Sequence, residues 1–306
     1  MAAVLLRRAL RVEAAERVVL CGSAGALRGF SQQHLPAVMT RCPWTRTPAA
    51  AASVRHYSSE LKDDLRVRYL DGADQGELVR ICCSSVHTYI LIFVFQMFDA
   101  VEDIKKNNKV RSVIFCSLVP GIFCAGADLK ERAKMHQSEV GPFVSKARAL
   151  ITELGNLPVP TIAAIDGAAL GGGLEMALAC DIRIACGTQR LPRIVGVSFA
   201  KELIFAARVV DGTEALRVGL VSQAVEQNKS GDAAYLQALE LAREINPQGP
   251  IAVRMAKLAI NQGTEVDLST GLAIEEACYA QVIPTKDRLE GLAAFREKRI
   301  PQFKGE

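Results

Sequence analysis

The sequence ALGGGLEMA at residues 169–177 decides the fold of this chain. It is predicted to follow a strand at residues 161–165 and to open a buried helix. Three consecutive glycines let the backbone approach a ligand closely, and the N–H groups of a helix start point toward that ligand. Such a site stabilises negative charge. No Gly-Lys-Ser/Thr follows and no G-x-G-x-x-G is present, so the motif is neither a P-loop nor a dinucleotide fingerprint.

Glu175 is the candidate catalytic residue of this motif. It lies three residues after Gly172, so its carboxylate is expected near a group held by the Gly172 N–H. A carboxylate beside a developing oxyanion suits proton transfer at the carbon next to a carbonyl. The alternative is structural: a tight strand–helix turn in which Glu175 is only a buried residue at the helix start.

A second loop, PGIFCAGADLK at residues 120–130, has similar properties. It is predicted to follow a strand and to open a polar helical segment. The small residues at positions 124–127 allow a bare backbone N–H to face a ligand. Lys130 is placed to meet an anionic group such as a phosphate, whereas Asp128 is equally well explained as a helix cap.

The rest of the pattern predicts an α/β core followed by a helical extension. Residues 65–70 and 77–81 flank a turn and are expected to form a β-hairpin. The other strands are predicted at residues 110–116, 161–165 and 182–185, and the clearest helices at residues 143–154, 252–261, 272–281 and 286–298. Gly155 is expected just past the end of the first of these helices.

The segment VHTYILIFVFQMF at residues 86–98 shows no clear period of 2 or 3.6. Residues 89–95 are all apolar, have high β propensity and carry no charge. Two interpretations remain open. The segment is a fully buried strand, or it is exposed and an aggregation hazard.

The net positive charge of the chain comes from its N-terminal part. The chain has 37 Lys and Arg against 33 Asp and Glu, a net charge of +4. Residues 1–57 contain eight Arg, no Lys and two Glu, which gives +6 and leaves −2 for residues 58–306. This composition is typical of a mitochondrial transit peptide, with cleavage predicted after Tyr57 and delivery to the matrix. A disordered tail is the alternative, and Arg7 and Arg8 disfavour a secretory signal.

Composition excludes several other classes of protein. Half of the residues are hydrophobic and 23% are charged, which rules out a disordered chain. No apolar run reaches the roughly 18 residues of a membrane-spanning helix. The nine Cys lack paired spacing and the four His are scattered, so neither a disulfide framework nor a metal site is expected.

FCAGADLKE at residues 123–131 and GAALGGGLEMALACD at residues 167–181 together resemble the crotonase, or enoyl-CoA hydratase, superfamily. The resemblance implies an α/β fold of the ClpP/crotonase type, in which ββα units form a spiral and C-terminal helices drive homo-oligomerisation to a trimer or hexamer. The implied organisation is a transit peptide at residues 1–57, a spiral core at residues 58–245 and a helical region at residues 246–306.

The same resemblance implies the substrate and the site residues. The substrate is an acyl-CoA thioester, and no separate cofactor is expected because coenzyme A is part of the substrate. The backbone N–H groups of Ala127 and Gly172 would form the oxyanion hole for a thioester enolate. Glu175 matches one of two glutamates that share a water and transfer its proton. The substrate-binding residues would be Ala127, Asp128, Leu129 and Lys130, with Lys298 and Phe295 reaching in from a neighbouring subunit. A surface helix explains the last two equally well.

Two segments depart from the family pattern. After the strand at residues 182–185 the family has a further segment with its second catalytic glutamate, whereas here Cys186 runs directly into GTQRLP. Asp181 and Glu202 do not replace that glutamate, because one precedes the strand and the other lies well beyond the join. Loss of one general acid or base typically lowers a rate about 10²–10⁴-fold, so hydration by this chain is predicted to be impaired.

The second departure is RICCSSVHTYILIFVFQ at residues 80–96, where the family has a strand, a CoA-contacting loop and a Lys-bearing helix. In one member of the family that helix is implicated in binding AU-rich RNA. Only Lys105, Lys106 and Lys109 remain of a basic stretch, so RNA binding has little electrostatic support. Both departures have abrupt edges, which favours alternative splicing or a faulty gene model as their origin.

Three functional hypotheses remain. The first is an enoyl-CoA hydratase, indicated by Glu175 and the two loops. The second is a non-catalytic relative that binds acyl-CoA or RNA, favoured by the missing glutamate. The third is a reaction that needs one carboxylate, such as isomerisation or thioester cleavage, which an oxyanion hole alone permits.

Overall fold

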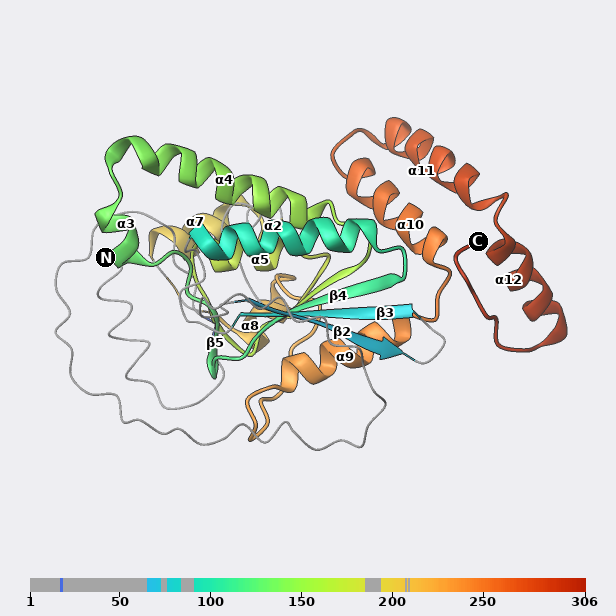
Figure 1. The fold of residues 1–306 in the computed structure, drawn as a ribbon, viewed down its shortest axis with the longest axis horizontal. Helices are drawn as coiled ribbons and strands as arrows, with labels where there is room; N and C mark the ends of the chain where they lie inside the picture. Colours follow the sequence, from blue (N-terminus) through green and yellow to red (C-terminus); the bar gives the residue numbers. More distant parts are fainter. Residues whose placement is uncertain are drawn as a thin grey trace.

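A computed structural model describes residues 17–18, 65–72, 76–83, 91–184, 194–206, 208 and 210–306. At its centre is a five-stranded sheet with the order β2-β3-β4-β6-β8 (Figure 1). The strands are β2 (Leu65–Gly72), β3 (Gly76–Cys83), β4 (Val110–Ser117), β6 (Thr161–Ala164) and β8 (Ile182–Ile184). β2 and β3 form the predicted antiparallel hairpin, and the other neighbours pair in parallel.

The sheet is covered on both faces. In β4, Val113 and Phe115 belong to one apolar cluster, whereas Ile114 and Cys116 belong to another. Because successive side chains of a strand point to opposite faces, a strand buried on both sides is a continuous apolar run. The first cluster contains side chains of α2 (Leu91–Lys106), α4 (Gln137–Gly155) and α5 (Gly172–Ala179), and the second those of α9 (Ala233–Ile245).

The segment at residues 86–98 is not a buried strand, so that interpretation is wrong for its described part. Residues from Leu91 onward form the helix α2, while residues 84–90 lie outside the described part of the chain. Phe93, Met97 and Ile104 are buried, but Phe95 is 50% exposed. The buried positions recur at helical spacing over residues 93–104. This spacing extends past residue 98, where the segment that showed no clear period ends.

The helix predicted at residues 143–154 is confirmed but begins earlier. α4 starts at Gln137, because His136 closes a capping box with Glu139: the His136 side chain accepts from the helix backbone, and Glu139 accepts from the His136 N–H. The cap at its other end is Asn156, and Gly155 is the last helical residue. Among the described residues, no helix combines the length and the hydropathy needed to cross a membrane.

Smaller elements connect these layers. β5 (Gly121–Cys124) and β7 (Gly167–Ala169) form a separate two-stranded parallel sheet, and α3 (Leu129–Lys134) follows β5. α7 (Val197–Phe205), β9 (Val210–Asp211) and α8 (Gly212–Arg217) precede α9. β1 (Arg17–Val18), within the predicted transit peptide, pairs antiparallel with β9.

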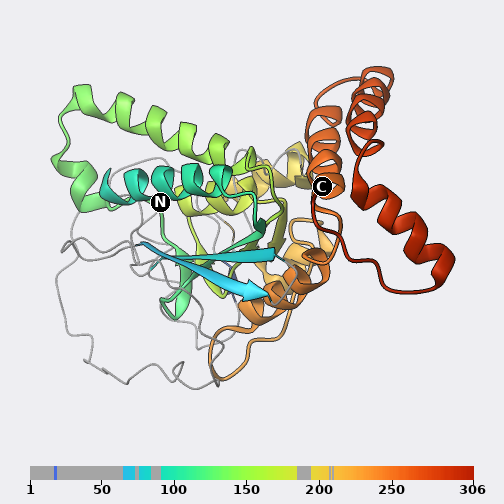
Figure 2. The same cartoon turned by 45° about the vertical axis from the view of Figure 1, so that its right-hand side comes forward.

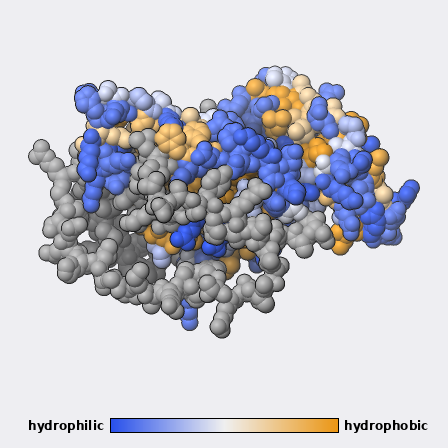
Figure 3. Space-filling view, viewed as in Figure 1, coloured by the Kyte–Doolittle hydropathy of each residue, from blue (hydrophilic) through white to orange (hydrophobic). Residues whose placement is uncertain are grey.

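Three C-terminal helices stand to one side of the sheet in both views (Figures 1 and 2). They are α10 (Pro250–Gly263), α11 (Leu268–Val282) and α12 (Lys286–Glu297). All three helices are predicted by the sequence, but α10 and α11 begin two and four residues earlier than expected. We call them the C-terminal arm. Figure 3 shows hydrophobic residues on the surface of the arm. Leu268, Leu272 and Phe295 of the arm are each more than half exposed.

Candidate functional site

The two glycine-rich loops lie side by side. β5 and β7 pair in parallel, with Gly121 opposite Gly167 and Cys124 opposite Ala169. Beyond this pairing, the Leu170 N–H donates to the Cys124 carbonyl at 2.8 Å. The β5–β7 pairing and this hydrogen bond hold Cys124 against Leu170, and this brings the two motifs into one site.

Glycine is required where the loops touch. A Cβ on Gly126 would lie 2.9 Å from the Leu170 carbonyl oxygen and 3.3 Å from the Gly172 nitrogen, and the φ of Gly126 is +85°. A Cβ on Gly173 would lie 2.4 Å from the Cys124 carbonyl oxygen. These contacts are with backbone, which cannot move aside as a flexible side chain does. Ala127 follows directly and is half-buried against the core.

The start of α5 forms the other side of the site. Its cap is Gly171, whose φ of +51° suits glycine, and among the described residues other than its chain neighbours no atom lies within 4 Å of the position that a Cβ would take there. Gly172 is the first residue of α5, so its peptide unit belongs to the positive end of the helix dipole.

Glu175 is in the first turn of α5 and is half-buried. Residues three apart on a helix share a face, so Glu175 lies on the side of α5 that carries Gly172. The Glu175 N–H donates to the Gly171 carbonyl at 3.2 Å, which is part of the helix start. The structure thus brings Ala127, Gly172 and Glu175 to one place, as the resemblance implies.

Asp128 is the N-cap of α3. Its Oδ1 accepts from the Lys130 N–H at 2.7 Å, so the capping interpretation of Asp128 is confirmed. Leu129 is the first residue of α3, and the side chain of Lys130 is exposed beside the site.

Lys298 and Phe295 are not brought to this site within one chain. Both lie at the end of α12, at the opposite end of the molecule from α3 (Figures 1 and 2). Lys298 is exposed and has a left-handed backbone with φ of 53°, and Phe295 is 88% exposed.

The two acids nearest to the altered join have structural partners. Asp181 Oδ2 accepts from the N–H and the Oγ1 of Thr161, both at 2.8 Å, and pairs with Lys257 at 2.8 Å. Glu202 pairs with Arg208 on the surface. The predicted join at residues 185–187 lies outside the described residues. Within the described residues, Asp181 and Glu202 are thus both engaged in structural contacts.

Asp166 has a role that the sequence did not reveal. Its carboxylate accepts from the backbone N–H groups of Ala234 at 2.7 Å and Tyr235 at 3.0 Å, and from Gln227. It thereby holds the start of α9 against the strand that leads into the site. Burial raises the pKa of this carboxyl above its usual value. The sequence showed Asp166 only as the residue before a glycine, and no local signal points to its distant partners.

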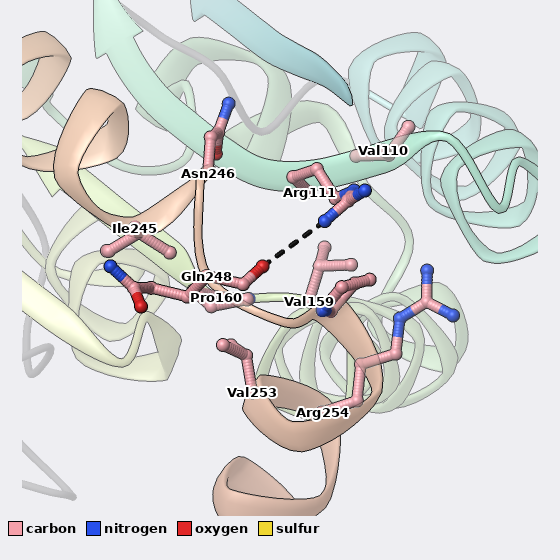
Figure 4. A pocket seen from close by; sticks show the side chains of 10 residues that line it. Val110, Arg111, Val159, Pro160, Ile245, Asn246, Gln248, Val253 and Arg254 are labelled. Carbon is pink, nitrogen blue, oxygen red and sulfur yellow. Dashed lines mark hydrogen bonds between the residues drawn. The ribbon is translucent and has the colours of Figure 1, made fainter. Parts of the chain in front are cut away.

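A small cavity lies elsewhere in the described part of the chain, between β4 and the C-terminal arm. It has a volume of about 10 Å³, room for about one water, and Arg111 donates across it to the Gln248 carbonyl at 3.2 Å (Figure 4). An adjoining groove of about 560 Å³ is lined by Lys109, Arg254 and Lys304, among others. Neither space is lined by a residue of the two loops. Within the described part of the chain, no group of three or more His, Cys, Asp or Glu is arranged to hold a metal ion.

The mixed, mostly parallel sheet, the paired glycine loops and the helix that starts on them define a protein of the crotonase fold. The chain belongs to the enoyl-CoA hydratase/isomerase family, whose model matches residues 90–186 and 185–306.

Named relatives are similar over most of their length. The mouse protein named methylglutaconyl-CoA hydratase, mitochondrial, is 57% identical over 308 residues, covering 93% of this chain and 98% of that protein. The human protein of the same name is 59% identical over 286 residues, covering 86% and 84%. A crystal structure of enoyl-CoA hydratase from Bacillus anthracis aligns with a TM-score of 0.73 at 41% identity, covering 79% of this chain and all of that one.

The comparisons also bear on the altered join. The two segments matched by the family model meet at residues 185–186, where the sequence places the missing segment. The alignment to the mouse protein spans 308 positions, but 93% of 306 residues is only about 285, so about 23 positions have no counterpart in this chain. The break between the two segments of the family model is what marks the join along the chain.

Proposed function

We propose that this chain is a mitochondrial matrix protein that binds an unsaturated acyl-CoA and hydrates it slowly. The observation that carries the proposal is the meeting of Ala127, Gly172 and Glu175 on two loops that backbone hydrogen bonds hold together. The names of the mouse and human relatives favour methylglutaconyl-CoA, an intermediate of leucine breakdown, as the substrate.

The chemistry follows from the placement of these groups. The N–H groups of Ala127 and Gly172 would donate to the thioester oxygen, which becomes negative as an enolate forms. One such donor is typically worth about 3 kcal/mol at the transition state. Glu175 would transfer a proton of the water that adds, with the hydroxyl and the hydrogen entering on the same face of the double bond. Lys130, exposed at the edge of the site, would meet a phosphate of coenzyme A.

The missing segment sets the expected rate. Glu175 would have to work without the second glutamate of the family, and Asp181 is held by Thr161 and Lys257. Loss of one acid–base group typically costs about 10²–10⁴-fold. Sequencing the transcript would show whether the join at residues 185–187 exists in the message or arises from a faulty gene model.

The test is hydration of methylglutaconyl-CoA by the chain beginning at Ser58. We expect a rate 10²–10⁴-fold below that of the mouse relative, and a further fall in Glu175→Gln. A rate equal to that of the mouse protein would refute the impairment. Equal rates for the chain and for Glu175→Gln would refute the role of Glu175. Calorimetric titration with the acyl-CoA should show that Glu175→Gln still binds it.

We also propose that the chain assembles as a trimer or hexamer through the C-terminal arm. The arm exposes Leu268, Leu272 and Phe295, and α12, which ends just before Lys298, lies at the opposite end of the molecule from α3 (Figure 1). In an assembly, Lys298 would contact coenzyme A bound to a neighbouring subunit. Light scattering after size exclusion measures the mass directly, and a monomer at micromolar concentration would contradict this proposal.

A non-catalytic role remains the second candidate. It is favoured by the missing glutamate, and it predicts acyl-CoA binding without turnover. A reaction that needs one carboxylate, such as isomerisation or thioester cleavage, would instead give a product other than the hydrated acyl-CoA. RNA is the weaker ligand, since Lys105 pairs with Glu102 and Glu153, and Lys106 lies 3.9 Å from Glu102. Salt-sensitive binding of AU-rich RNA by the same preparation would favour RNA as the ligand.

A further inference from the structure

Cys82 and Cys116 form a close thiol pair outside the loops of the site. They are register partners on the neighbouring parallel strands β3 and β4, and their sulfur atoms lie 3.0 Å apart. Each is 2% exposed, in the apolar cluster beneath α9. Cys82 falls within residues 80–96, which depart from the family pattern, so the family does not imply this pair.

The guanidinium of Arg80 lies beside the same pair of thiols. Arg80 Nε donates to Cys116 Sγ at 3.3 Å, and the Arg80 guanidinium lies 4.0 Å from the centre of the Tyr235 ring. Positive charge beside a thiol favours the thiolate, which is the nucleophilic form.

The two thiols differ in acidity. The hydrogen bond with Cys116 and the charge of Arg80 lower the pKa of Cys82, despite its burial. The hydrogen bond with Cys82 and burial raise the pKa of Cys116. The pair therefore combines one thiol of lowered pKa with one of raised pKa. Cys180 shows the contrast, because burial raises its pKa to about 12 and keeps it as an inert thiol.

We propose that Cys82 and Cys116 are a redox-active pair that hydrogen peroxide converts into a disulfide joining β3 to β4. The Cys82 thiolate attacks one peroxide oxygen, the O–O bond breaks, and the second oxygen leaves as hydroxide, which becomes water on protonation. Cys82 is then a sulfenic acid. The Cys116 sulfur attacks it, the S–S bond forms, and the oxygen leaves as a second water with the Cys116 proton. Two thiols are oxidised and one peroxide is reduced.

The backbone is suited to this bond. Neighbouring strands lie about 4.8 Å apart, within the roughly 4.4–6.8 Å between the Cα atoms of a disulfide. Each cysteine is the next-to-last residue of its strand, since β3 ends at Cys83 and β4 at Ser117. Local opening of the sheet at these strand ends would give a small oxidant its route to the sulfurs.

The test treats the native full-length chain with hydrogen peroxide, blocks free thiols, and maps the linked peptides by mass spectrometry. We expect a Cys82–Cys116 link that has lost two hydrogens and is reversed by dithiothreitol. The link should be absent in Cys82→Ala and retained in Cys83→Ala. Cys83 is the matched control, because it is equally buried but packs in the cluster on the other face of the sheet.

Arg80 provides a second, kinetic test. Arg80→Met should slow formation of the link several-fold, and Arg80→Lys should recover part of the rate because it restores a charge. Stepwise oxidation of Cys82 to sulfinic acid without a link would overturn the proposal. So would a link that persists in Cys82→Ala, or peroxide treatment that leaves both thiols free in the folded chain.

Discussion

Gly126 shows at the scale of one residue how the site depends on a bare backbone. Its φ is +85°, and the Leu170 carbonyl oxygen occupies the space next to the position of a Cβ. We expect Gly126→Ala to destabilise the chain by about 1–3 kcal/mol, from backbone strain and from the clash with the other loop. Acyl-CoA binding should weaken as well, because the clash separates the two loops. Thermal unfolding and calorimetric titration measure both effects.

Gly121→Ala is the matched control for this substitution. Gly121 also has a positive φ, of +70°, but nothing lies within 4 Å of its Cβ position. It should therefore show the strain alone, with a smaller loss of stability and little change in ligand binding. Equal effects of the two substitutions would mean that the contact between the loops is not what requires glycine at position 126.

Glu290 gives a dependence on pH at the same scale. The Arg299 guanidinium donates to the Glu290 carboxylate at 2.6 and 2.9 Å, and the Gln302 N–H donates to it at 2.8 Å. These hydrogen bonds lower the pKa of Glu290 to about 2. A carboxyl whose folded pKa is depressed stabilises the fold above its unfolded pKa of about 4.3. That contribution is lost as the pH falls toward about 2. The amide resonance of Gln302 should therefore titrate near pH 2, and in Glu290→Gln this transition should disappear.

At the scale of an element, α2 is the clearest case of tertiary context deciding structure. In a strand, residues 93, 95 and 97 would share a face; in a helix, residues 93 and 97 do, and residue 95 is on the other side. Phe93 is fully buried and Phe95 is half-exposed, with Lys146 Nζ 3.2 Å from its ring centre. The helix thus places two phenylalanines, two residues apart, in different environments.

This difference predicts unequal effects of two equivalent truncations. Phe93→Ala should lower the free energy of unfolding by about 3–5 kcal/mol, because it leaves a cavity in the core. Phe95→Ala should cost no more than about 1 kcal/mol, the value of a surface cation–π contact. Urea unfolding of the two variants measures both. Similar losses at the two positions would argue for a buried strand.

At the scale of the whole molecule, a largely buried ion pair joins the C-terminal arm to the sheet. Lys257 of α10 pairs with Asp181 before β8 at 2.8 Å and donates to the Val159 carbonyl at 2.9 Å. The two side chains are 9% and 22% exposed, so solvent screens the pair only weakly. Asp181 in turn bonds Thr161 at the start of β6.

Lys257→Met should therefore loosen the arm, at a cost of about 3 kcal/mol, because Asp181 keeps a charge that has lost its partner. Lys106→Met is the control, since Lys106 is 75% exposed and 3.9 Å from Glu102, and it should cost less than about 1 kcal/mol. Thermal unfolding compares the two variants, and light scattering shows whether assembly fails with Lys257→Met. A stable, fully assembled Lys257→Met protein would contradict this role for the pair.

The sequence by itself determined the features that are local along the chain. The hairpin, the strand at residues 110–116 and the helices of the arm follow from spacing of apolar residues, which acts within a few residues. The two glycine-rich loops also stand out locally, and their order along the chain carries the family resemblance. Ala127, Gly172 and Glu175 could be named for this reason before their geometry was known.

Only the tertiary structure decided what depends on residues far apart in the chain. It turned residues 91–98 into a helix, placed the Asp166 carboxylate on the start of α9, and brought Cys82 to Cys116 and Lys257 to Asp181. The reason is physical: hydrogen bonds and buried contacts between distant segments depend on how the sheet and its covering layers pack together. No pattern within a short window records that packing.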